Sequence, residues 1–582
     1  MTTVPNSDPP PAVAEPGADE AAHSDLVAKL VAEAFSGLSR GARPAATPAV
    51  PAKIPGVPDL SGLSATDASS AVPPVHPSAQ PAAPKLNASE KSTSSATPSG
   101  AHTPDSGDSY AFGEPRCNGD YRPKGRKSET KTANGNPLLG LPEAESVAAP
   151  EYNFLRGGNP SGKSPSACQS YPKNAVPVPK FDIEGVRRDF PALHQLVNGK
   201  PLIWLDNAAT THKPQAVIDA TSQFYSRDNS NIHRAAHALA ARSTELFEAG
   251  REKARKFLGA ADAKEIVFVR GTTEAINLVA QSYGRKNINV GDEIIVSELE
   301  HHANIVPWQL LAEQVGATVR VIPINDRGEL ILEEYVKLLT GKTKFVSVAH
   351  VSNSLGTINP VEQIIALAHA RGVPVMIDGA QSTPHLPVNV SALDADFYVF
   401  SGHKIFAPTG IGALYGKTSL LEAMPPWQGG GHMIKDVRFE KTIYQNAPEK
   451  FEAGTPDIAG VVGLGAAIDY LFKVGIPAIA AYEHALLEYA TQALATIPGL
   501  RPIGTATTKA SVLSFVIPGV PNESVARHLD KNGIAVRAGH HCAQPAIRHF
   551  GLESSVRPSL AFYNTREEVD ALVLALRSLK RN

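Results

Sequence analysis

The stretch DFYVFSGHKIFAPTGIG, residues 396–412, passes from an apolar, aromatic run into the polar tetrad SGHK (401–404) and then into turn residues. An apolar run of this length, bounded by turn residues, predicts a buried strand. Lys404 would then lie beyond the carboxyl end of a parallel strand, where α/β proteins place their ligands. It is a candidate for a Schiff base with a carbonyl cofactor, although taken alone it reads as an ordinary surface lysine.

Two earlier strand ends carry residues that suit one such cofactor. PVMIDGAQS (374–382) ends a strand at Asp378, and an acid that keeps a pyridinium nitrogen protonated lets pyridoxal phosphate (PLP) act as an electron sink. EIVFVRGTTEAINLVA (265–280) reads as a strand, a Gly-Thr-Thr turn and a helix. Amides and hydroxyls at a helix N-terminus suit a phosphate, although alone the threonines would be ordinary caps. The three segments together indicate a PLP site.

Strands and helices alternate from about residue 181 onward. Apolar runs such as EIIVSEL and KFVSVAH are separated by helical patterns, which predicts βαβ units and a mostly parallel sheet covered on both faces. We therefore expect an α/β fold. A large PLP-binding domain would span 194–473, and a small α+β domain would combine 179–193 with 474–582.

Residues 1–178 have a different composition, dominated by Pro, Ala, Ser, Gly and Thr with few large apolar residues. Such a composition predicts a disordered tail. One segment, SDLVAKLVAEAFSGLSR (24–40), repeats apolar residues at helical spacing after Ser24 and predicts a short amphipathic helix over 24–38. This helix could fold onto a partner's groove, or it could be a chance apolar cluster in an Ala-rich tail.

Composition argues against several classes of function. The formal net charge is −2 and the aromatic and basic residues form no sustained basic patch, so we do not expect nucleic-acid binding. No apolar run is long enough to cross a membrane. Cys117, Cys168 and Cys542 cannot form a disulfide framework, and the N-terminus has no signal-peptide pattern, so we expect a cytoplasmic protein.

The segment SELEHHANIVPW (297–308) places two adjacent histidines after another strand. Histidine ligand pairs on a helix are usually four residues apart, and no carboxylate and histidine set completes a site here. We therefore expect no metal. A ring stacked on the flat cofactor is the better interpretation of His301.

Cys542 lies in RAGHHCAQP (537–545), a polar, turn-prone loop. A lone cysteine is usually a small buried hydrophobe. Here Arg537, His540 and His541 surround it with groups that favour the thiolate, which is the nucleophilic form. The loop therefore predicts a nucleophilic cysteine.

These segments, together with LDNAAT (205–210), NIHRAAHALA (231–240), HVSNSLGTINP (350–360), FEAGTP (451–456) and SLAFYNT (559–565), resemble the SufS-type (group II) cysteine desulfurases. The resemblance runs from about residue 181 to the end and covers none of the tail. It implies a fold-type-I PLP enzyme with a seven-stranded sheet. It also implies conversion of L-cysteine to L-alanine with a persulfide on Cys542, supplying sulfur for uses such as iron–sulfur cluster assembly.

The resemblance also implies the role of each site residue. Lys404 would hold PLP and move the substrate's α-proton, and Cys542 and His301 would complete the catalytic set. Asp378 would contact the pyridine nitrogen of the cofactor and Gln381 its ring oxygen. The phosphate would be bound by Thr272, Thr273, Ser401 and His403, with Thr455 from a second subunit. Asn353 would be a further cofactor contact. The substrate carboxylate would meet Arg557 and Asn353, with Arg537 and Arg234 at the entrance.

The resemblance bears on partners as well. It implies a homodimer and a sulfur-acceptor protein of the SufE or SufU type. In PPWQGGGHMI (425–434), Gln428 and His432 stand where some relatives have acidic residues, which leaves the acceptor open. The tail resembles the cargo-loading segments that direct such enzymes into encapsulin shells, so an encapsulin nanocompartment is the expected location if a shell is present.

Three alternative functions stay open. A selenocysteine lyase shares the scaffold, although the Cys542 loop favours sulfur. An aminotransferase of the same fold would need no cysteine in this loop. A protein that acts mainly as a scaffold would explain the long tail, whereas intact Lys404, Asp378 and Cys542 argue for an active enzyme.

Overall fold

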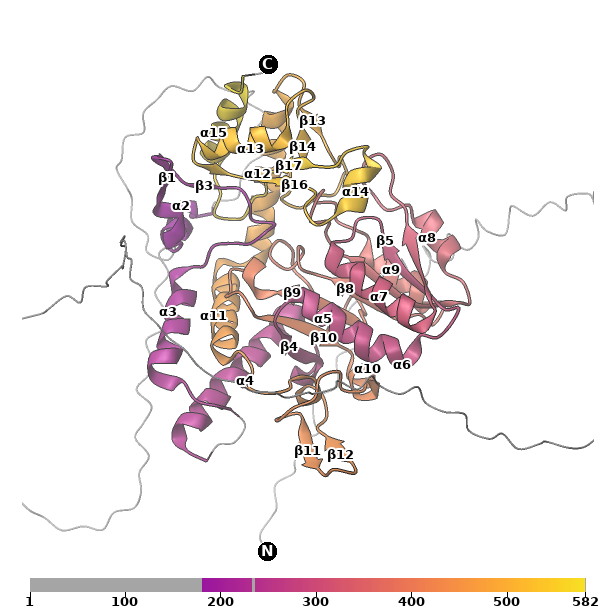
Figure 1. The fold of residues 1–582 in the computed structure, drawn as a ribbon. Helices are drawn as coiled ribbons and strands as arrows, with labels where there is room; N and C mark the ends of the chain where they lie inside the picture. The colour runs from indigo at the N-terminus through magenta and orange to yellow at the C-terminus, as the bar shows by residue number, and fades with distance from the viewer. Residues whose placement is uncertain (1–180, 233–235, 581–582) are drawn as a thin grey trace, which may run out of the picture. The chain divides into compact units, whose positions relative to one another are not determined.

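The computed structural model describes residues 181–232 and 236–580 (Figure 1). The expected tail over 1–178, its helix over 24–38 and Arg234 lie outside the described residues. Among the described residues no single helix is long and apolar enough to cross a membrane. The helices α11 (Ile458–Val474) and α12 (Ile476–Ala495) reach that length and hydropathy only when taken together, and they are bent by 73° relative to each other.

A seven-stranded sheet forms the centre of the fold, and it confirms the expected architecture. Its strand order is β4-β10-β9-β8-β7-β5-β6. The five strands from β9 to β6 run parallel, whereas β10 is antiparallel to both of its neighbours. The strands are β4 (Ile266–Val269), β5 (Glu293–Ser297), β6 (Thr318–Ile322), β7 (Thr343–Ala349), β8 (Val375–Asp378), β9 (Phe397–Ser401) and β10 (Gly412–Gly416).

The central strands are apolar throughout because both faces of the sheet are covered. Every residue of β8, β9 and β10 is buried. Side chains alternate between two cores: Tyr398 and Phe400 of β9 pack in one, whereas Phe397 and Val399 pack in the other. A strand buried on both sides reads as a continuous apolar run, which is the pattern in the sequence.

Helices cover both faces of this sheet (Figure 1). The helix α4 (Ala238–Leu258) packs on α11, and α5 (Thr272–Val279) packs on β9 and β10. The other helices of this part are α3 (Gln215–Gln223), α6 (Arg285–Asn287), α7 (Val306–Val315), α8 (Leu332–Leu338), α9 (Val361–His369) and α10 (Thr418–Ala423). The strands β11 (Ile434–Val437) and β12 (Thr442–Tyr444) form a hairpin that extends away from the central sheet (Figure 1).

The C-terminal residues form a smaller α+β arrangement around a second sheet, in the order β13-β14-β17-β16. Its strands are β13 (Arg501–Pro502), β14 (Phe515–Val516), β16 (Arg537–Gly539) and β17 (Ser555–Arg557), with helices α12, α13 (Asn522–Asp530), α14 (Gln544–His549) and α15 (Arg566–Arg577). Near the start of the described chain, α2 (Ile183–Arg188) and the strands β1 (Leu196–Val197) and β2 (Lys200–Pro201) precede β3 (Ile203–Trp204), which pairs in parallel with β15 (Ile534–Ala535). The expected boundaries at residues 194 and 473 stay a prediction.

Candidate active site

One cavity of about 260 Å³ gathers most of the expected site residues. It lies where the ends of the central strands meet the cysteine loop, and the segment 208–210 forms part of its wall. The expected residues that line it are Thr272, Thr273, His301, Asn353, Asp378, Gln381, Ser401, His403, Lys404, Arg537, Cys542 and Arg557.

The N-terminus of α5 is shaped to hold an anion. The Ser401 hydroxyl accepts a hydrogen bond from the Thr272 N–H and donates one to the Thr272 hydroxyl, both at 2.9 Å. Gly271 precedes the helix with φ of 153°, and a Cβ there would lie 3.1 Å from the Ser401 hydroxyl oxygen. Glycine therefore leaves room at the start of the helix, where backbone N–H groups and the helix dipole favour a phosphate.

Lys404 and Asp378 line the same cavity, and both groups are buried. Burial lowers the pKa of Lys404 to about 8, because it disfavours the ammonium, and the charge of Asp378 opposes that shift. Burial raises the pKa of Asp378, partly offset by a hydrogen bond of 2.9 Å from the Ala380 N–H. An amine with this pKa is a better nucleophile and proton carrier near neutral pH than an ordinary lysine.

His301 is a neutral ring. Burial, and then the charge of Lys404, lower its pKa to about 3. Its Nδ1 accepts a hydrogen bond of 3.0 Å from the Ala303 N–H, so the proton of the neutral ring lies on Nε2. A neutral imidazole can lie against a flat cofactor ring without placing a second cation beside Lys404.

Residues 208–210, the end of the segment LDNAAT, line the cavity and contact two of the site residues. Gln381 Nε2 donates a 2.6 Å hydrogen bond to the Ala208 carbonyl, and His403 Nδ1 lies 3.2 Å from the Thr210 hydroxyl. Burial lowers the pKa of His403 to about 4. Both site residues are thus oriented by backbone and side-chain groups of residues 208–210.

The two arginines of the expected substrate site share one carboxylate, Asp206. Arg557 Nη2 donates to Asp206 Oδ1 at 3.1 Å, and Arg537 Nη2 donates to Asp206 Oδ2 at 3.0 Å. Arg557 Nη1 donates to the Asn353 carbonyl at 2.8 Å. Among the described residues, the buried Nε of Arg557 has no hydrogen-bond partner. This unpaired N–H of a buried guanidinium can donate a hydrogen bond to a substrate carboxylate oxygen.

Sequence reasoning missed Asp206. The signal was present, since an acidic residue directly follows an apolar strand in LDNAAT. Its two arginine partners, however, lie 331 and 351 residues further along the chain.

The cysteine loop follows β16 and has an unusual backbone. His541 and Cys542 both adopt positive φ, 55° and 53°, a region that residues other than glycine seldom occupy and that often marks a functional site. Asn353 Nδ2 donates to the His541 carbonyl at 2.6 Å, and the His302 N–H donates to the Cys542 carbonyl at 2.7 Å. These contacts hold a partly buried free cysteine in the lining of the cavity.

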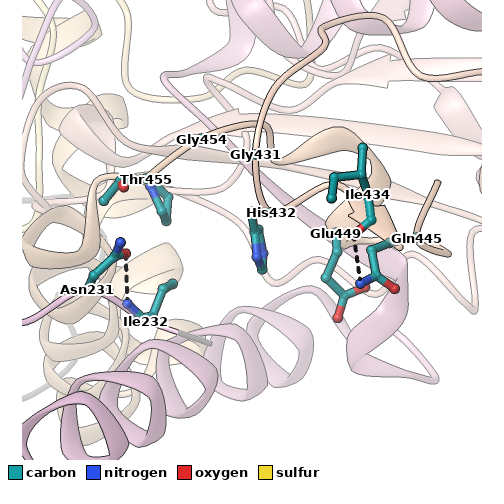
Figure 2. Close-up of a pocket in the computed structure, with 10 residues that line it drawn as sticks. Asn231, Ile232, Gly431, His432, Ile434, Gln445, Glu449, Gly454 and Thr455 are labelled. Carbon is teal, nitrogen blue, oxygen red and sulfur yellow. Dashed lines mark hydrogen bonds between the residues drawn. The ribbon is translucent and has the colours of Figure 1, made fainter. Parts of the chain in front are cut away.

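Two of the expected site residues are not among those lining this cavity. Thr455 lines a different cavity of about 450 Å³ with Asn231, Ile232 and His432 (Figure 2). Arg234 lies outside the described residues. The roles assigned to individual residues remain predictions, although the geometry brings the others together.

The fold and this site define a fold-type-I PLP enzyme. The family model for class-V aminotransferases matches residues 203–572. The chain is 62% identical over 400 residues to a cysteine desulfurase of Synechococcus elongatus (69% of this chain, 64% of that protein). It is 52% identical over 396 residues to a probable cysteine desulfurase of Vibrio cholerae (68% of this chain, 98% of that protein).

A solved structure agrees with these relatives. The crystal structure of the cysteine desulfurase CsdA from Escherichia coli matches with a TM-score of 0.64 and 45% identity, over 68% of this chain and 97% of that one. The chain belongs to the cysteine desulfurase family of class-V aminotransferases. It spans 64% of the length of the Synechococcus relative, which is less than two thirds.

Proposed function

We propose that this protein is an active, SufS-type cysteine desulfurase that converts L-cysteine to L-alanine and keeps the sulfur as a persulfide on Cys542. The observation that carries the proposal is that one cavity unites Lys404, Asp378, the unpaired Nε of Arg557 and the free thiol of Cys542. Aminotransferase chemistry would need the first three but gives no reason for the thiol.

The residues of the cavity fit PLP. Thr272, Thr273, Ser401 and His403 would hold its phosphate, Asp378 and Gln381 would contact its ring, His301 would lie against the ring face, and Lys404 would bind it covalently. Bound there, PLP supplies a sink for the electron pair left when the substrate's α-proton is removed.

Arg557 and Lys404 would prepare the substrate. The free Nε of Arg557 would hold the substrate carboxylate, while Asp206 and the Asn353 carbonyl keep the guanidinium in place. The Lys404 Nζ, with its pKa near 8, would accept the α-proton and later return it.

Cys542 would then remove the sulfur. Its thiolate attacks the substrate's sulfur, a sulfur–sulfur bond forms and the bond from that sulfur to the β-carbon breaks. The electron pair of the broken bond stays with the β-carbon and takes up a proton, so that alanine leaves and no external oxidant or reductant is needed. The half-exposed position of Cys542 leaves its persulfide within reach of an acceptor.

The test is alanine release from L-cysteine by the purified protein and by a Cys542→Ser variant that retains the PLP absorbance. We expect the wild type to form alanine and the variant to form none. Equal activity of the two would exclude Cys542 as the nucleophile and favour a selenocysteine lyase or another PLP-dependent elimination. An inactive wild type with PLP bound would favour the scaffold hypothesis.

We also propose that the protein is a homodimer in which Thr455 completes the partner's phosphate site. In support, Thr455 lines two cavities other than the one around Lys404. The β11–β12 hairpin exposes apolar side chains, including the fully exposed Phe439, and a patch of this kind marks an interaction surface. Light scattering gives the test: a dimeric mass is expected, and a monomer with full PLP content would contradict the proposal.

The remaining partners are also proposals. We propose that an acceptor of the SufE or SufU type takes the persulfide sulfur, and that residues 1–178 recruit the enzyme into an encapsulin shell within the cytoplasm. Co-expression of a candidate shell with the full-length protein and with a variant lacking residues 1–178 tests the second point. Only the full-length protein should sediment with the shell, and equal sedimentation of both would exclude recruitment by the tail.

A further inference from the structure

Three side chains of the kind that bind metals meet at Cys542, which lines the cavity. One ring nitrogen of His302, one of His540 and the Cys542 Sγ lie within 4.8 Å of one another. The two imidazole rings stack with centroids 5.4 Å apart and planes 29° apart. Apart from the expected effect of His540 on the thiolate, the proposed sulfur-transfer steps use neither histidine.

Hydrogen bonds brace the cluster from both sides. His302 follows β5, whereas His540 and Cys542 belong to the loop after β16, and the His302 N–H donates to the Cys542 carbonyl at 2.7 Å. The Cys542 N–H donates to His540 Nδ1 at 3.0 Å, and the Gln544 N–H donates to His302 Nε2 at 3.2 Å. The unprotonated nitrogen of each neutral ring is the one that accepts this backbone hydrogen bond. A metal would bind that nitrogen by displacing the backbone N–H.

We propose that His302, His540 and Cys542 form a binding site for a thiophilic divalent cation, with Zn²⁺ the best chemical match. Two imidazoles and one thiolate select Zn²⁺ over Mg²⁺ or Ca²⁺, and three protein ligands leave a fourth position for water. Zinc bonds of about 2.0–2.3 Å place ligand atoms roughly 3.3–3.7 Å apart. The ligand atoms must therefore approach one another by up to about 1 Å, which a rotation of the exposed His540 side chain can supply.

Metal binding would inhibit sulfur transfer. The Cys542 thiol loses its proton to solvent and its sulfur forms a bond to the metal, with no change of oxidation state. The same sulfur lone pair can no longer attack the substrate. This consequence rests on the proposed function, whereas the binding itself does not.

Cobalt is a suitable probe of this site, because a cobalt–thiolate bond produces a charge-transfer absorption. Full-length PLP-bound protein, first treated with a chelator, would be titrated with Co²⁺ and then with Zn²⁺. We expect one Co²⁺ per chain with a thiolate band in the difference spectrum, displacement of the band by Zn²⁺, and slower alkylation of Cys542 by iodoacetamide when Zn²⁺ is bound.

Variants assign the ligands. Cys542→Ser should lose the thiolate band although Cys117 and Cys168 remain. The double variant His302→Gln/His540→Gln should bind Co²⁺ more than about 100-fold more weakly, since even outer partners of metal ligands contribute about 10–100-fold. His549→Gln is the matched control: His549 lies on nearby α14 and contacts Glu298 instead, so its binding should equal that of the wild type.

The absence of a thiolate band in the wild type would overturn the inference. Unchanged Co²⁺ affinity in the double variant would overturn it as well. Alanine release by the metal-free wild type, measured separately, distinguishes the two proposals. If alanine forms but no metal binds, only the metal site is wrong. If metal binds but no alanine forms, only the proposed function is wrong.

Discussion

The two walls of the active-site cavity are built in different ways. The cofactor wall consists of the ends of β4, β8 and β9 in a sheet covered on both faces, and Asp378 and Ser401 are only 5% and 6% exposed. The cysteine wall is a loop with two residues at positive φ and a half-exposed thiol. A desolvated, fixed wall suits proton movement, because it shifts pKa values and holds groups in place. An accessible loop suits a sulfur that must leave.

The largest effect is expected on the cofactor wall. Lys404→Ala removes both the covalent anchor of PLP and the proton carrier, so we expect alanine formation to fall by at least about 10²–10⁴-fold, the usual contribution of a general acid–base group. Alanine assays with added free PLP measure it. A variant that keeps more than a tenth of the activity would show that another group moves the proton.

The pKa of Lys404 gives a pH dependence for cofactor uptake. Only the neutral amine reacts with the PLP aldehyde, so the rate of PLP incorporation into cofactor-free protein should rise with pH and level off above about pH 8. An ordinary lysine, with pKa near 10.4, would be about a hundredfold less reactive at pH 8.

The matched control for this pH dependence is Asp378→Asn. The Asp378 carboxylate raises the pKa of Lys404, so its neutralisation should move the midpoint to lower pH. Stopped-flow absorbance follows the reaction in both proteins. A midpoint near pH 10 in the wild type would mean that Lys404 is not desolvated as described.

Asp206 joins the two walls, and its loss should weaken substrate binding. Asp206→Asn removes charge-assisted hydrogen bonds from Arg537 and Arg557, each contributing about 1.5–3 kcal/mol. We expect KM for L-cysteine to rise roughly 10- to 100-fold while kcat changes little and the PLP spectrum is retained. An unchanged KM would show that the arginines hold their positions without this carboxylate.

The smallest effects are expected from glycine substitutions, which should affect PLP affinity on the cofactor wall and sulfur transfer on the cysteine wall. Gly271→Ala combines a strained φ with a Cβ that presses on Ser401, so PLP affinity should fall. A Cβ added at Gly539 would meet no atom within 4 Å, but the residue has φ of 134°. Gly539→Ala should therefore cost about 1–3 kcal/mol of backbone strain. We expect it to slow sulfur transfer a few-fold without changing PLP affinity. PLP titration and kcat on both variants test this; equal loss of PLP affinity would contradict the distinction.

Sequence reasoning located the cofactor wall better than the cysteine wall. Continuous apolar runs predict buried parallel strands, and the rule that ligands bind at their carboxyl ends places Lys404, Asp378 and Thr272 together without knowledge of the folded chain. Each inference used residues that are close in sequence, and the seven-stranded sheet confirms the architecture.

The contacts between the walls could not be predicted in this way. The bonds of Asp206 to Arg537 and Arg557, and the meeting of His302 with His540, join residues hundreds of positions apart. The proposed metal site combines His302 with two residues of the loop after β16, so the segment 297–308 alone could not indicate it. The loop with positive φ at His541 and Cys542 is likewise bound by Asn353 and His302, which belong to other segments.

The most direct test of the account is intact-mass and peptide mass spectrometry after a single turnover with L-cysteine, with alanine measured in the same sample. The account predicts one added sulfur atom per chain, located on the peptide that contains Cys542, and one alanine formed for each sulfur bound. Alanine formed without sulfur on Cys542, or sulfur found instead on Cys117 or Cys168, would contradict it.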